Sequence, residues 1–133
     1  MVNETAVSQS QQSDAIPVVY KQWSLSVEIN PFGTLSGWNN ILQVGIGGDG
    51  AYGDRTPAIF FNSDTSLHFM TAISGHWNYY YPDTENILIG EWTMVDIAQI
   101  RRSDGDYNFT ISIGNNIGRH RIIKFYFIKI IFC

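Results

Sequence analysis

A hydrophobic period of two constrains this 133-residue chain more than any other feature. In the run Trp23–Asn30 (WSLSVEIN), apolar and polar residues alternate strictly until Pro31 and Gly33 interrupt the pattern. Successive side chains of a β-strand point to opposite faces, so this alternation indicates a strand with one buried face.

Six further segments have strand character, and clusters of Gly, Pro, Asn and Asp separate them as turns require. They are Asn40–Ile46, Pro57–Asn62, Ser66–Ile73, Trp77–Tyr81, Trp92–Ile100 and Tyr107–Ile113. No apolar i, i+3, i+4, i+7 pattern persists for the length of a helix within residues 1–116. The sequence therefore predicts an all-β domain, either a two-layer sandwich or a barrel.

Composition narrows the class of protein further. With 44% hydrophobic and only 15% charged residues, the chain fits one folded domain and does not have the composition of a disordered protein. The single cysteine, Cys133, excludes an internal disulfide and any CxxC zinc site. The net charge of −4 argues against a nucleic-acid partner.

The charge is distributed unevenly along the chain. Residues 1–116 hold twelve acidic and four basic residues, whereas residues 117–133 hold four basic residues and no acid. We therefore divide the chain into a polar lead-in at residues 1–17, expected to be disordered and without a signal peptide, a β domain at residues 18–116, and an Ile- and Phe-rich basic tail at residues 117–133.

Motifs for catalysis are weak. Gly45–Gly50 fits the G-x-G-x-x-G expression, but the residues that follow do not open a helix, so we interpret it as a glycine-rich loop between strands. No predicted strand carries two carboxylates on one face, as sugar hydrolysis would require. His68, His76 and His120 have no metal-ligand spacing. We expect no catalytic residues.

Carboxylates in the predicted loops make calcium a candidate ligand. Asp49, Asp54, Asn62 and Asp64 supply the oxygen atoms that calcium prefers, but Asp and Asn are also the usual residues of turns, and there is no EF-hand spacing. We expect no resident cofactor and retain calcium as the alternative.

The aromatic run His76–Tyr81 (HWNYYY) is the most suggestive local feature. Flat aromatic rings with a few polar groups suit the apolar faces of sugars. Alternation places Trp77, Tyr79 and Tyr81 on one face and Asn78 and Tyr80 on the other, and at least one of these faces should pack in the core.

Two N-glycosylation sequons occur, at Asn3 and Asn108. In the predicted strand Tyr107–Ile113 the apolar residues share one face, so Asn108 and Thr110 should point to solvent and accept a glycan. This favours an extracellular location.

The order of several segments resembles a concanavalin A-like lectin/glucanase domain of the laminin-G-like kind. The segments are residues 23–42, GDRTPAIFF from Gly53, SLHF from Ser66 and GEWTMVDIAQ from Gly90. The resemblance covers about residues 18–116 and implies an antiparallel two-sheet jelly-roll sandwich used in extracellular adhesion, with carbohydrate, protein or calcium ligands. The E-x-D-x-x-E strand of the glucanase branch is absent.

Domains of this kind continue beyond Asn115 with further strands, so we expect the jelly roll to be incomplete and the tail to be an aberrant or truncated ending. Alternatively, Arg121–Phe132 forms a replacement strand, because Ile and Phe favour pleated surfaces. A third alternative is contact with a membrane surface, since Ile122–Cys133 is too short to span a bilayer.

We therefore predict a non-catalytic binding or adhesion module of an extracellular or cell-surface protein, with carbohydrate or protein as ligand, no nucleic-acid partner and no transmembrane span. The candidate ligand-binding residues are Trp38, Tyr52, Asp54, Arg55, Trp77 and Tyr79. The alternatives are a glycoside hydrolase of the glucanase branch and a purely structural interaction domain.

Overall fold

A computed structural model describes residues 20–34, 36–46, 48, 50–73, 75–81, 86–115 and 120–128, and for residues 115 and 120–128 it describes the backbone only. The described part of the chain contains strands and no helix. The strands are β1 (Trp23–Ile29), β2 (Asn39–Gln43), β3 (Ala58–Phe61), β4 (Leu67–Ile73), β5 (His76–Tyr81), β6 (Thr93–Arg101), β7 (Tyr107–Asn115) and β8 (His120–Ile128).

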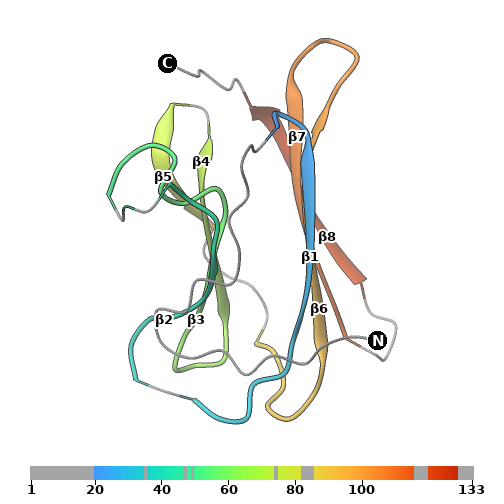
Figure 1. Cartoon of the computed structure of the whole chain (residues 1–133). Helices are drawn as coiled ribbons and strands as arrows, with labels where there is room; N and C mark the ends of the chain where they lie inside the picture. The colour runs from blue at the N-terminus through green and yellow to red at the C-terminus, as the bar shows by residue number, and fades with distance from the viewer. Residues whose placement is uncertain are drawn as a thin grey trace.

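The strands form two antiparallel sheets that face each other as separate layers (Figure 1). The first sheet has the order β1-β6-β7-β8, and the second has the order β2-β3-β4-β5. The chain passes from the first sheet to the second after β1 and returns after β5. The all-β prediction is confirmed, and the arrangement is that of a β-sandwich.

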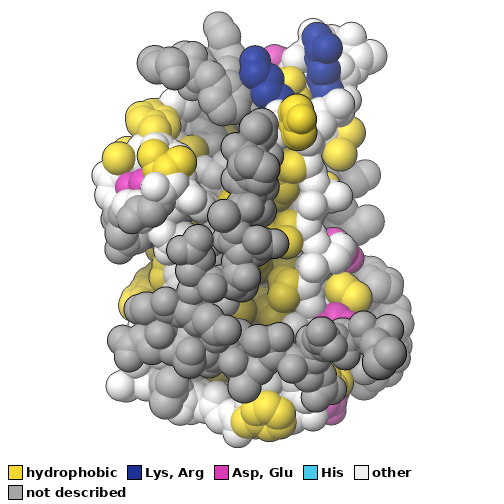
Figure 2. Space-filling view, viewed as in Figure 1, with side chains coloured by type: hydrophobic (Ala, Val, Ile, Leu, Met, Phe, Trp, Pro, Cys, Tyr) yellow, Lys and Arg dark blue, Asp and Glu magenta, His cyan; other side chains and the backbone are white. Residues whose placement is uncertain are grey.

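The hydrophobic core lies between the sheets and draws on the inward-facing positions of both. Its buried members are Ile29, Ile59, Phe61, Leu67, Phe69, Ile73, Ile87, Val95, Ile97, Phe109 and Ile111. All of them except Ile87, which lies between β5 and β6, come from the apolar phase of the alternating strands, as the period of two predicts. In Figure 2, hydrophobic side chains are visible along the seam between the two layers.

All seven segments predicted as strands are strands in the structure, with ends that shift by a few residues. The glycine-rich segment connects β2 to β3, as expected for a loop. In this hairpin, Val44 N–H donates to the Pro57 carbonyl at 2.9 Å and Ile46 N–H donates to the Gly53 carbonyl at 3.1 Å.

The tail contributes the eighth strand. The β8 backbone pairs antiparallel with β7, with Ile111 opposite Ile123 and a register shift between Tyr107 and Phe109. This arrangement matches the replacement-strand alternative for the tail over residues 120–128. The predicted lead-in at residues 1–17, with its sequon at Asn3, lies outside the described residues, as do Asp49 and Cys133.

Shortening a core side chain should show how much packing between the two sheets contributes to the stability of the fold. Phe109 of β7 is 2% exposed and packs edge-on against Trp23 of β1, with ring centroids 5.9 Å apart. We expect Phe109→Ala to lower the free energy of unfolding by about 3–5 kcal/mol in urea titrations, because it leaves a cavity between the layers. Ile100→Ala, at a position 49% exposed, is the control and should change it by less than about 1 kcal/mol. Equal effects would contradict this account of the core.

Candidate binding surface

The outer face of the second sheet carries a continuous row of rings. Register places Phe60 of β3 directly opposite His68 of β4, and Met70 of β4 opposite Tyr80 of β5. Ile59 and Phe69, which neighbour Phe60, His68 and Met70 in sequence, are buried in the core. Because side chains alternate along a strand, the residues next to them point to the outer face of the sheet. Trp38, just before β2, joins them on this face.

The rings contact one another across the strands. Trp38 lies 4.3 Å from His68 and 5.9 Å from Phe60, measured between ring centroids, with both interplanar angles at 77°. His68 stacks on Tyr80 at 5.4 Å and 15°. Trp38 and Tyr80 are 56% and 55% exposed. We call Trp38, Phe60, His68 and Tyr80 the aromatic row.

A polar group accompanies the aromatic row. Arg55, at the end of the β2–β3 loop, places its guanidinium 5.7 Å from the centre of the Phe60 ring, a cation–π distance. Its Nη1 atom donates to Asn78 Oδ1 of β5 at 3.1 Å and also lies 3.1 Å from Met70 Sδ. The row thus has a cation and an amide held in fixed positions on the same face.

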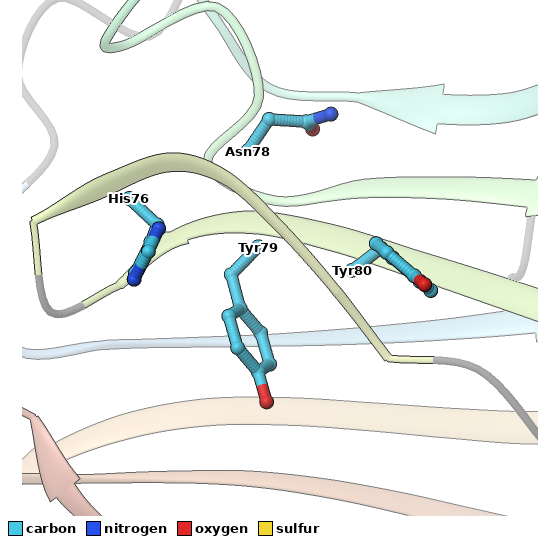
Figure 3. Close-up of a pocket in the computed structure, with 4 residues that line it drawn as sticks. All are labelled: His76, Asn78, Tyr79 and Tyr80. Carbon is cyan, nitrogen blue, oxygen red and sulfur yellow. The ribbon is translucent and has the colours of Figure 1, made fainter.

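A shallow hollow of about 390 Å³ lies along β5, lined by His76, Asn78, Tyr79 and Tyr80. In Figure 3, Asn78 and Tyr80 lie on one side of the strand, and His76 and Tyr79 lie on the other. Register explains this division, because Tyr79 is opposite the buried Thr71 and, after a register shift between Thr71 and Ile73, His76 is opposite the buried Ile73. The centroids of the His76 and Tyr79 rings are 6.2 Å apart.

Asp54 is bonded to its own loop. Its Oδ2 accepts the backbone N–H groups of Gly50 at 2.8 Å and Ala51 at 2.6 Å, and the residue is 4% exposed. These donors, Gly50 first, hold the pKa of Asp54 below its usual value of 3.8, and they outweigh the opposing effect of burial. A Cβ atom at Gly48 would lie 2.6 Å from Asp54 Oδ1, so the loop needs glycine where it meets this carboxylate.

Asp64 has a similar structural role in the turn between β3 and β4. Its Oδ1 accepts the Ser66 hydroxyl at 2.6 Å and the Ser66 N–H at 3.0 Å, and these bonds, the hydroxyl first, lower the pKa of Asp64. Within the described ranges, no group of three or more His, Cys, Asp or Glu side chains could hold a metal ion. Asp54 and Asp64 thus each accept hydrogen bonds within their own turn or loop.

The six predicted site residues fall in three places. Trp38 and Arg55 lie on the face of the aromatic row. Tyr52 and Asp54 belong to the β2–β3 loop, where the Tyr52 hydroxyl donates to the Gly75 carbonyl. The other two, Trp77 and Tyr79, lie on β5 and are 39% and 43% exposed.

Sequence reasoning missed Phe60 and His68 and placed too little weight on Tyr80. A signal was present in the β3 sequence AIFF, which is apolar in both phases although only one face of a sandwich sheet faces the core. Ala58 and Phe60 occupy the second phase, so the large ring of Phe60 was a candidate for the outer face, where it is half-buried.

The polar outer face of the first sheet differs from expectation at Asn108. Predicted to point to solvent, Asn108 is half-buried, and its buried Oδ1 accepts no hydrogen bond from the described residues. Asn108 is in the outer phase of β7, opposite the exposed Ile100 of β6, and the structure gives no cause for the burial of its Oδ1. On the same face, Glu28 of β1 is diagonal to Asp96 of β6, which accepts the Ser26 hydroxyl at 2.5 Å.

Comparison with protein-family models, with curated proteins and with solved structures finds no match to this chain. Over the residues that the structure describes, there is no helix of the length and apolar character needed to cross a bilayer.

The charge on Asp54 should make the β2–β3 loop sensitive to acid. Because its pKa is lower in the folded chain than the usual 3.8, Asp54 stabilises the fold above pH 3.8, and this stabilisation is lost as the pH falls through the lowered value. We expect Asp54→Asn to destabilise the chain at pH 7 in urea titrations and the difference from wild type to shrink below pH 3.8. Glu28→Gln, at an exposed acid, is the control. A difference independent of pH would contradict the role of the charge.

Proposed function

We propose that this chain is a non-catalytic binding module of lectin-like type, and that the outer face of the second sheet binds carbohydrate. The aromatic row is the observation that carries the proposal. Large aromatic side chains are normally buried, so a row with Trp38 and Tyr80 exposed and Phe60 and His68 half-buried between them points to a ligand. The chemistry suits sugars, whose C–H faces pack on aromatic rings.

The polar groups beside the row support the same ligand class. A sugar needs hydrogen-bond partners for its hydroxyls as well as an apolar platform. Arg55 and Asn78 supply a guanidinium and an amide at the margin of the rings, and their mutual bond at 3.1 Å keeps both side chains in place before a ligand arrives.

We further propose that the sandwich is a concanavalin A-like jelly roll of the laminin-G-like kind, acting outside the cell in adhesion. The support is the order of the resembling segments and two antiparallel sheets compatible with that fold. A protein ligand on the same face is the alternative within this class.

Glycoside hydrolysis has weaker support, because it requires two carboxylates flanking the bond to be cleaved. The aromatic row, Arg55, Met70 and Asn78 include no carboxylate. The Glu28 and Asp96 carboxylates belong to the opposite layer, on its outer face. Binding without cleavage is therefore the function that this surface favours.

Ring removal tests the proposal. The wild-type chain should bind at least one glycan in an array, and Trp38→Ala and Tyr80→Ala should each weaken that binding about tenfold in calorimetric titrations. Phe32→Ala is the matched control, because Phe32 is 90% exposed but lies outside the row. EDTA should leave the affinity unchanged, since the row contains no calcium ligands. Failure to bind any glycan, or an equal loss with Phe32→Ala, would refute the proposal.

A further inference from the structure

The two exposed rings of the aromatic row, Trp38 and Tyr80, have planes that are far from parallel. His68 contacts both of them. The Trp38 ring is inclined at 77° to the His68 ring, and the Tyr80 ring at 15°, so the planes of Trp38 and Tyr80 differ by at least the difference between these angles, roughly 60°. Trp38 and Tyr80 therefore form two walls of a corner, with His68 between them.

His68 and Tyr80 are stacked on each other and do not lie side by side in one plane. Their planes are nearly parallel, and their centroids are 5.4 Å apart. Two rings lying in one plane at that separation would bring their edge atoms closer than van der Waals contact, so these rings overlap in an offset stack. No single flat surface therefore runs across the row from Trp38 to Tyr80.

The corner has the size of a small ligand. The Trp38 and His68 centroids are 4.3 Å apart, and the Trp38 and Tyr80 centroids can be no farther apart than this distance and the 5.4 Å between His68 and Tyr80 combined. Each of these distances is comparable to the width of one pyranose ring. A single sugar unit placed over the half-buried His68 would thus reach both exposed rings.

Polar groups lie on the Tyr80 side of the corner. Asn78 is two residues before Tyr80 on β5, so both side chains point to the same face, and both line the hollow along this strand (Figure 3). The Arg55 guanidinium is bonded to Asn78 Oδ1 at 3.1 Å. Polar groups on one side of an apolar site fix the orientation of a ligand, as the hydroxyls of one sugar unit require.

We propose that the aromatic row binds a single sugar unit of a soluble glycan in the corner between Trp38 and Tyr80, and not the flat face of an insoluble polysaccharide. This inference rests on the sugar-binding function proposed above and specifies its ligand class. Only rings that share a plane can all lie at van der Waals distance from a flat face. Rings at a steep angle instead enclose one unit from two sides, as concave ligand sites do.

Calorimetric titrations of the full chain with methyl glycosides of the common monosaccharides, and with the matching disaccharides and tetrasaccharides, test this inference. We expect at least one methyl glycoside to bind, and its tetrasaccharide to bind less than about threefold more tightly, because further units extend beyond the corner. Trp38→Ala and Tyr80→Ala should each weaken binding of that glycoside about tenfold, since one unit contacts both rings. Phe32→Ala, at an exposed ring outside the row, is the control and should bind like the wild type.

Suspensions of microcrystalline cellulose and of chitin supply flat, insoluble faces, and neither should deplete the wild-type chain from solution. Urea unfolding establishes that the ring variants remain folded. Adsorption that Trp38→Ala abolishes, binding that requires a tetrasaccharide, or a loss of glycoside binding in only one of the two ring variants would each overturn the single-unit corner while leaving sugar binding by the row intact. A chain that binds none of these sugars, soluble or insoluble, would instead refute the proposed function, so the two failures are distinguishable.

Discussion

The burial of one face of each sheet against the other is the interaction on which the rest of this structure depends. Ile59 and Phe69 of the second sheet and Ile97 and Phe109 of the first share one core. Alternate residues of a strand point to opposite faces of its sheet. When one set of alternate residues is buried in the core, the other set lies on the outer face of the sheet. The two outer faces are consequently the surfaces left for function.

Those two outer faces have opposite chemistry. On the first sheet, Ser26 and Asp96 are paired across β1 and β6 by a hydrogen bond, as is ordinary for a solvated face. On the second sheet, Phe60 and Tyr80 occupy equivalent outward positions. These rings lie outside the core that the described residues form, so the difference between the faces is the physical basis for proposing that the second sheet binds a ligand.

The sequence alone predicted the strands well but the site only in part. Periodicity is a local signal, and it located every segment from β1 to β7. The aromatic row depends instead on register, which aligns Phe60 with His68 through hydrogen bonds between distant segments, and no local pattern encodes that alignment. Likewise, composition identifies Asp54 as an acid in a glycine-rich loop, but only the folded loop directs its carboxylate toward Gly50 and Ala51.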